Sequence, residues 1–165
     1  RLSACGDDTN RDRLLGNFIA FCELAARYGM SVDLENMGWR TIRTYAESAT
    51  LVRSSGQHNA GVLVDAIHFF RNGGSVDDIS VDFVQHLQLC DVTGPAPTQS
   101  EDMTAEARAG RLAPGDGNLP LEQLLRKFRG KTSISVEVPL VGKGDLLEHL
   151  KNLHSKAHTL LSHVR

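Results

Sequence analysis

The sequence predicts an α/β fold of the (β/α)8-barrel type, in which short parallel strands alternate with helices. Four short segments, residues 31–35, 61–65, 83–88 and 133–137, have β-branched or apolar centres and end in Glu35, Asp65, Gln88 and Glu137. Helical pattern follows each segment. Glu35 and Asp65 are 30 positions apart, and Asp65 and Gln88 are 23 apart, which suits the ~31 residues of one barrel unit. The last gap is longer and holds a long loop.

The first part of the chain alternates strand and helix. We expect a strand end at residues 2–5 and a helix over 10–28, with Thr9 as its cap and Gly29 as its stop. The strand at 31–35 precedes a helix over 42–52, near whose start Thr44 and Glu47 form a capping box. The strand at 61–65 is expected to run on into residues 66–70. The apolar face of the first helix is Leu14, Phe18, Phe21, Cys22 and Ala25.

The second part continues the same alternation. A short helix is expected at 75–79, and the strand at 83–88 continues through Leu89. Residues 90–119 are expected to be one long loop, which in a compact domain is functional or mobile. A helix then begins at Pro120 and ends at Gly130. The last strand covers 133–138, and a closing helix is marked by Leu146, Leu150, Leu153, Ala157 and Leu160.

Four strand–helix units and a strand end do not close an eight-stranded barrel. The chain begins at Arg1 without a methionine and runs at once into what reads as a strand end. Half a barrel exposes two sheet edges and an apolar face, both of which favour association. We therefore expect residues 1–165 to be part of one domain, completed by further sequence or, less simply, by another copy.

The composition is typical of a globular domain in a reducing compartment. Of the 165 residues 41% are hydrophobic and 23% charged, and the net charge is −2 without a basic stripe. Nothing favours a nucleic-acid or membrane partner, and no apolar run approaches the ~20 residues of a membrane helix. The three cysteines lack zinc-site spacing. We expect a cytoplasmic protein.

The four strand-end residues together predict a metal site. Each alone would be a solvated strand terminus, but Glu35, Asp65 and Glu137 at one barrel mouth would repel each other unless a cation lay among them. Three acids and the amide of Gln88 form an oxygen-rich set that suits a hard divalent ion, with Mn²⁺ or Mg²⁺ favoured.

Three further residues are candidates for substrate contacts. His68 follows Asp65 by three positions, at the rim of the mouth, where it would bond a substrate oxygen or simply face solvent. Arg111 in the long loop could clamp a carboxylate or phosphate, or remain solvated. Trp39 could wall the pocket or cover a helix. His86 alternates with Gln88 and should also face inward, beside the site or in the core.

These motifs resemble the xylose isomerase-like TIM-barrel superfamily, and within it proteins labelled sugar phosphate isomerase/epimerase. The resemblance rests on residues 34–37, 64–69, 86–91, 111–117 and 135–138, and implies that the chain spans barrel strands 4–8. In that family a Glu, an Asp, a His or Gln and a Glu on strands five to eight hold the metal, which maps onto Glu35, Asp65, Gln88 and Glu137. Co²⁺ and Zn²⁺ are further candidate ions. The family's substrate histidine maps onto His68.

The resemblance implies an enzyme acting on a sugar, a sugar phosphate or a polyol-derived substrate. As an isomerase or epimerase it would move a proton through an enediolate with Glu35 and Glu137 as base and acid. Gln88, where many epimerases carry histidine, resembles the dehydroshikimate dehydratase branch, so a lyase acting on dehydroshikimate or an inosose is the alternative. An inactive fragment or binding protein is the third, and assembly into a homo-oligomer is left open.

The related DNA-repair enzyme endonuclease IV carries an Asp-x-His zinc-ligand pair that would fall at positions 109–111, where this chain has Ala109 and Arg111. Neither ligand is present, which agrees with the absence of a basic stripe. We therefore expect no nucleic-acid substrate.

Overall fold

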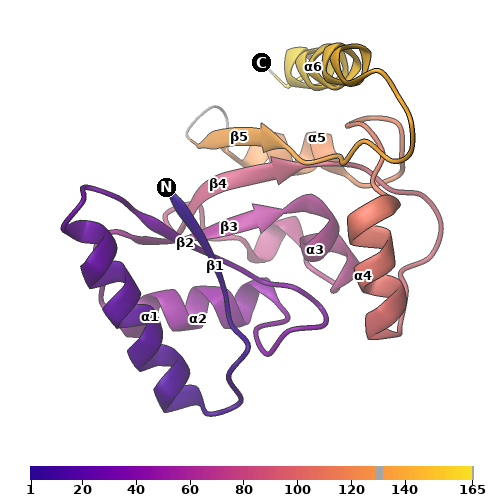
Figure 1. Ribbon diagram of the computed structural model, residues 1–165. Helices are drawn as coiled ribbons and strands as arrows, with labels where there is room; N and C mark the ends of the chain where they lie inside the picture. Colours follow the sequence, from indigo (N-terminus) through magenta and orange to yellow (C-terminus); the bar gives the residue numbers. More distant parts are fainter. Residues whose placement is uncertain (129–131, 165) are drawn as a thin grey trace.

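A computed structural model of the protein describes residues 1–128 and 132–164. Five parallel strands form one sheet in chain order, as Figure 1 shows. They are β1 (Leu2–Cys5), β2 (Val32–Glu35), β3 (Ala60–Asp65), β4 (Val84–Leu89) and β5 (Ser133–Val136). The helices are α1 (Arg11–Ala26), α2 (Tyr45–Ser55), α3 (Ala66–Arg71), α4 (Ser100–Ala109), α5 (Leu121–Phe128) and α6 (Leu146–Ser162), with a 3-10 turn at Val76–Asp78. The α/β class and the parallel sheet are as predicted.

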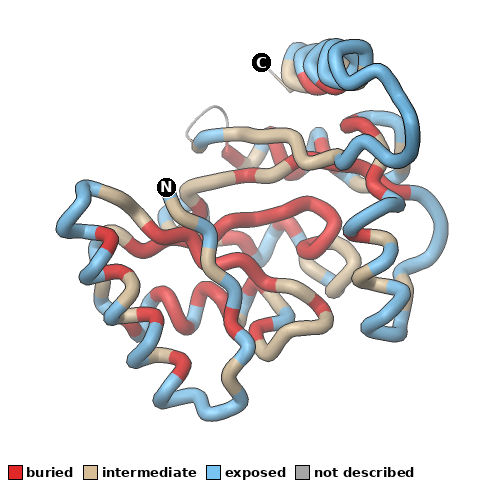
Figure 2. The backbone as a smooth tube through the Cα atoms, in the orientation of Figure 1, coloured by how far each residue is buried: buried red, intermediate tan, exposed pale blue. Residues whose placement is uncertain are grey.

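The two faces of the sheet carry different side chains. On one face, Val32, Val62 and Leu87 join the apolar sides of α1, α2 and α5 in a single core. The opposite face carries Asp33 and Glu35, because successive side chains of a strand alternate. Figure 2 shows that burial is deepest along β2 and β3. The polar face is therefore the one that can hold a site.

The first two helices begin where their capping residues dictate. The side chain of Asn10, and not the predicted Thr9, caps α1 by accepting from the N–H of Arg13. The predicted capping box of Thr44 and Glu47 is present, and it starts α2 at Tyr45. The expected helix start at residue 42 is wrong because Thr44 keeps extended backbone, so Ile42 lies in the preceding loop, fully buried in the core.

Strand β3 ends at Asp65, so the expectation that it runs on into residues 66–70 is wrong. The Asp65 carboxylate accepts from the N–H groups of Ile67 and His68, at 2.9 and 3.3 Å. This is an N-cap, and it starts α3 at the next residue. The cap places His68 on the first turn of a helix, directly above the strand end.

The predicted loop at residues 90–119 contains a helix, α4, which is a correction to the sequence analysis. The helix buries only Ala107 and has no side-chain cap, so neither signal that normally marks a helix is present. Its attachment is ionic: Arg71 makes two contacts with Glu106, at 2.6 and 3.0 Å, and donates to the carbonyls of Thr93 and Gly94. Tertiary contacts therefore hold this segment.

Within the described residues, the outermost strands β1 and β5 each pair with one neighbouring strand. Strand β5 ends two residues before the predicted position 138, and the predicted helix end at Gly130 lies outside the described residues. On α6 the predicted apolar face is only half covered: Leu153 is buried, whereas Leu146 and Leu150 are exposed. Among the described helices none is both long and apolar enough to cross a membrane.

We predict that Glu106→Gln loosens α4 without unfolding the domain. The substitution removes one charge of a largely buried ion pair, and α4 contributes little else to the core. The loss should be on the order of 1 kcal/mol and local to this helix. Trypsin should therefore cut after Arg108 several-fold faster, at nearly unchanged global stability. Glu101→Gln, at an exposed acid of the same helix, is the control, and equal cleavage of both variants would contradict the prediction.

Candidate metal centre

The carboxyl ends of β2 and β3 bring two acids together on the polar face of the sheet. Glu35 is the last residue of β2 and Asp65 the last of β3. Gln88 on β4 pairs in register with Asp65 on one side and with Ser135 on the other, so its side chain emerges on the same face as Asp65. Glu137 follows the end of β5. The predicted strand-end residues thus lie on neighbouring strands, at the carboxyl-terminal end of the sheet.

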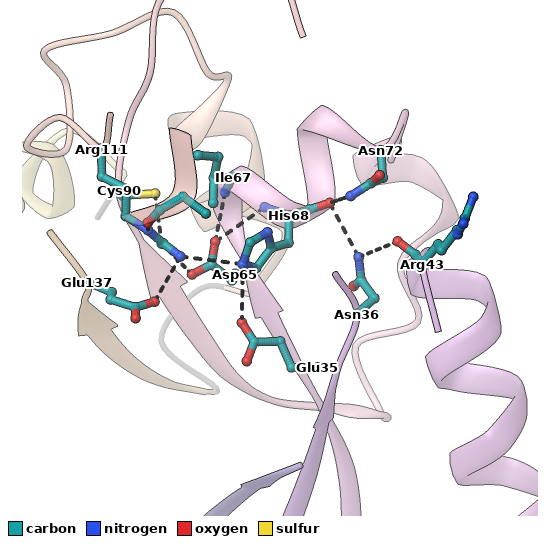
Figure 3. Close-up of polar contacts among 11 residues, drawn as sticks. Glu35, Asn36, Arg43, Asp65, Ile67, His68, Asn72, Cys90, Arg111 and Glu137 are labelled. Carbon is teal, nitrogen blue, oxygen red and sulfur yellow. Dashed lines mark hydrogen bonds and ion pairs between the residues drawn. The ribbon is translucent and has the colours of Figure 1, made fainter. Parts of the chain in front are cut away.

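Glu35, Asp65 and His68 form a compact buried group. Each offers a ligand atom, and these atoms lie within 4.8 Å of one another. The three residues are 8%, 1% and 4% exposed, and His68 Nε2 is 3.9 Å from Glu35 Oε1. Figure 3 shows the three converging from the two strand ends and from α3. The alternative of a solvent-facing His68 is therefore wrong.

Arg111 joins Asp65 to Glu137 at the outer side of this group. Its guanidinium donates to Asp65 Oδ2 at 2.6 Å and contacts Glu137 Oε2 at 3.0 Å, as Figure 3 shows. Its Nε donates to the carbonyl of Ala107 at 2.7 Å, at the end of α4. The side chain is 3% exposed, so the alternative of a solvated loop arginine is wrong. Glu137 is reached through this arginine and stands outside the compact group.

The pKa values of the group follow from burial and neighbouring charge. Burial raises the pKa of Glu35 to about 8, and the charges of Asp65 and Glu137 act in the same direction. Burial, aided by the positive charge of Arg111, lowers the pKa of His68 to about 4. At neutral pH His68 is therefore uncharged and keeps a lone pair that can bind a metal or accept a hydrogen bond.

Two asparagines and the tryptophan fix His68. The Nδ2 groups of Asn72 and Asn36 donate to its carbonyl, at 2.7 and 3.3 Å. The predicted pocket residue Trp39 packs edge-on against the imidazole, with ring centroids 5.0 Å apart. Sequence reasoning missed Asn36, although it directly follows Glu35 and so had to lie near the strand end.

Beneath Gln88 on the same face, His86 has polar partners. Its ring nitrogens lie 2.8 Å from the Ser135 hydroxyl and 3.1 Å from that of Ser133. The side chain is half-buried, so the alternative of a core histidine is wrong, and the inward orientation is as predicted. Sequence reasoning missed Ser133 and Ser135 as partners of His86. Together with Glu137 they occupy every second position, so their side chains are expected on the same face.

The donor set fits a divalent cation. Glu35, Asp65 and Glu137 supply three acidic groups, whereas Arg111 is the cation that contacts two of them among the described residues. Carboxylate oxygens with one imidazole nitrogen suit Mn²⁺ or Zn²⁺, and carboxylates with an amide suit Mg²⁺. Burial first, and then the charges of Asp65 and Glu137, raise the pKa of Glu35, and a bound cation would oppose both effects.

Comparisons with known proteins agree with this fold. The sequence model of the xylose isomerase-like TIM barrel family matches residues 2–154. Inosose isomerase from Halalkalibacterium halodurans is 29% identical over 126 residues, covering 70% of this chain and 42% of that protein. The 3-dehydroshikimate dehydratase from Pseudomonas aeruginosa is 28% identical over 123 residues, covering 69% of this chain and 19% of that protein. The chain thus spans less than half of either relative.

A solved structure extends the likeness over the whole chain. The IOLI protein, crystallised with a bound zinc atom, superposes with a TM-score of 0.80 at 18% identity. The match covers 99% of this chain and 63% of that protein. Its low identity shows the fold alone, which is an α/β TIM-barrel-like arrangement with a parallel five-stranded sheet.

We predict that metal-free protein loses stability as pH rises from about 6.5 to about 8. A carboxyl whose folded pKa is raised stabilises the fold below its unfolded pKa of 4.5, and this contribution is lost as pH rises toward 8. His68 has the opposite dependence, but only between about pH 4 and 6.5. Glu35 should therefore dominate above pH 6.5, with a loss on the order of 2 kcal/mol.

Urea unfolding in a chelating buffer measures this loss. Glu35→Gln should flatten the slope above pH 6.5, whereas Glu23→Gln, at an exposed glutamate of α1, should keep it. An equally steep slope in Glu35→Gln would show that another group titrates.

Proposed function

The chain belongs to the xylose isomerase-like TIM-barrel family, and from that premise we propose that it carries the reaction centre of a divalent-metal-dependent isomerase or epimerase. The substrate class is a sugar, a sugar phosphate or a cyclic polyol ketone. The relatives that support this proposal are an inosose isomerase and a 3-dehydroshikimate dehydratase. The proton moves through an enediolate.

One observation carries the proposal: Glu35 and Glu137 lie near the same acid, Asp65, but in different environments. Glu35 is buried and its pKa is raised to about 8, so it holds a proton near neutral pH. Burial also raises the pKa of Glu137, but its side chain is 44% exposed and lies against the guanidinium of Arg111, whose charge opposes that rise. Two carboxyl groups whose surroundings differ in this way can serve as acid and base in one reaction.

In the proposed reaction one glutamate removes the proton beside the substrate carbonyl and the other returns a proton to the neighbouring carbon or oxygen. Arg111 holds Glu137 in place, and neutral His68 accepts a hydrogen bond from a substrate hydroxyl or donates one to its carbonyl oxygen. Trp39 covers the imidazole and excludes water from that side. The asymmetric pair thereby supplies both proton transfers without outside groups.

A divalent ion fits this arrangement, and Glu35, Asp65, Gln88 and Glu137 are the residues proposed to hold it. The geometry adds His68, whose Nε2 lies with the carboxylates of Glu35 and Asp65. Such an ion supplies Lewis-acid polarisation of the substrate carbonyl, which acidifies the adjacent C–H.

Dehydration is the second candidate function, favoured by Gln88 and by the similarity to 3-dehydroshikimate dehydratase. It begins with the same proton abstraction and continues with loss of a β-hydroxyl. The structure does not favour a carboxylate clamp at Arg111, because its nitrogens already contact Ala107, Asp65 and Glu137. A neutral ketone substrate therefore fits the described residues better than a carboxylate.

We propose that residues 1–165 are the carboxyl-terminal part of one barrel domain, corresponding to strands 4–8. The two sheet edges with one neighbour each and the exposed leucines of α6 support this assignment. So does the coverage of 63% of the IOLI protein. The complete gene product is thus the form in which activity is expected, in the cytoplasm, and a chain without the remaining units would be the inactive fragment considered above.

We predict deuterium wash-in beside the carbonyl when the metal-loaded gene product is incubated with an inosose or a ketose in deuterated water. Glu137→Gln should abolish the wash-in, because it removes an acid/base group while keeping the size of the side chain. Mass spectrometry of the recovered substrate measures the exchange. Growth of enone or aromatic absorbance instead would identify the dehydratase, and neither signal across a panel of polyol ketones would sink both reactions.

We also predict that Mn²⁺ raises the melting temperature. An ion that binds only the folded state adds about 2.7 kcal/mol at a concentration ~100 times its dissociation constant. Gln88→Ala should weaken binding without altering the charge of the site, and Gln57→Ala, at a glutamine remote in the sequence, is the matched control. A melting curve indifferent to Mn²⁺ and Mg²⁺, with no metal found by elemental analysis, would count against the site.

A further inference from the structure

Asp91 is a buried carboxylate that the proposed mechanism leaves unused. It lies two residues beyond the end of β4 and is 1% exposed. Its side chain accepts from the backbone N–H groups of Val92, Gly115 and Leu119, at 2.9, 3.1 and 2.9 Å. Three donors satisfy this carboxylate, so its task is to organise the chain around it.

The backbone of the following loop is fastened to the same place. Asp91 and Leu112 exchange two backbone hydrogen bonds, at 2.9 and 2.8 Å. Gly117 packs so closely that a Cβ atom there would lie 2.4 Å from Asp91 Oδ1 and 2.4 Å from the carbonyl oxygen of Val92. Residues 112–119, which we call the Asp91 loop, therefore wrap around one side chain and admit no larger residue at position 117.

The Asp91 loop begins at the residue after Arg111. On its other side Arg111 is tied to α4 through the bond from Nε to the carbonyl of Ala107. From this backbone position its guanidinium reaches both Asp65 and Glu137. An anchored backbone fixes the point from which the arginine side chain extends, so holding the guanidinium at two acids costs side-chain entropy but little further backbone entropy.

We propose that Asp91 is a positioning residue that fixes Arg111 against Asp65 and Glu137. It acts through Leu112, the neighbour of Arg111, and contacts neither of the two acids in the described hydrogen bonds. Through Arg111 it sets the orientation of the half-exposed Glu137. The proposal rests on the proposed function only for the role of Glu137 in proton transfer, because the placement of Arg111 is measurable without substrate or metal.

The test follows the Nε–H signal of Arg111 by NMR in protein labelled with ¹⁵N-arginine. This group is buried and bonded to Ala107, so its hydrogen should exchange slowly. The signal is assigned by its loss in Arg111→Lys. Asp91→Asn places an N–H₂ donor against one of the three loop donors, and we expect Nε–H exchange to become about tenfold faster, since an unmade buried hydrogen bond costs about 1.4 kcal/mol or more.

Two further variants make the test independent of one substitution. Gly117→Ala leaves the carboxylate intact but pushes the Asp91 loop away from it, and the same faster exchange is expected. Asp116→Asn is the matched control: the same chemical change at an exposed aspartate of the same loop, which pairs with Lys156. It should leave the Arg111 signal as in wild type.

Protection of the Arg111 Nε–H unchanged in both Asp91→Asn and Gly117→Ala, with faster amide exchange at Gly115, would overturn the proposal, because Asp91 would then hold only the loop. In the wash-in assay, Asp91→Asn should lower kcat about tenfold at a KM within about twofold, and should add nothing in the Arg111→Lys background. If the two substitutions instead lowered kcat by the product of their separate effects, the proposal would also be overturned. Absence of wash-in from the wild type would defeat the proposed function, while the exchange data would still decide the role of Asp91.

Discussion

The carboxylate of Asp65 is the interaction on which the site depends. One oxygen ends β3 and starts α3 by accepting two backbone N–H groups, and the other receives the guanidinium of Arg111 at 2.6 Å. The first contact decides where His68 lies, because that residue is on the first turn of the helix so begun. The second brings a cation from a distant loop to the strand ends. A single buried acid therefore joins the sheet, a helix and the loop.

Charge explains why the surrounding structure is so constrained. Glu35, Asp65 and His68 are buried, and their potential metal-ligand atoms lie within 4.8 Å of one another. Two acids so close together cost free energy unless protons or cations compensate. The protein compensates in three ways: Glu35 keeps a proton near neutral pH because burial raises its pKa, Asp65 is bonded by backbone donors, and Arg111 bridges Asp65 to Glu137. The same features suit a divalent ion and proton transfer, so the electrostatic cost serves the proposed chemistry.

The position of Arg111 depends on contacts that lie outside the site. Helix α4 buries one residue and is held by the ion pair between Arg71 and Glu106, and the Asp91 loop is held by the Asp91 carboxylate and the backbone bonds between Asp91 and Leu112. Arg111 lies between these two attachments. Glu35 and Asp65, by contrast, end strands whose other face packs in the core, so their positions are fixed by the sheet. Rigid strands thus present the acids, and a separately anchored segment presents the arginine.

The sequence by itself determined the strands, their parallel order and the acids at their ends, because alternation within a strand and the strand–helix spacing are local patterns. Glu35, Asp65 and Glu137 could be found in this way. It did not determine α4, which has no cap and almost no buried face, nor the start of α3, where an acid chosen as a ligand proved also to be a helix cap. The burial of Arg111 and of His68 was decided by tertiary structure, since both depend on partners far away in the sequence: Asp65 and Glu137 for the arginine, and Asn36 and Trp39 for the histidine.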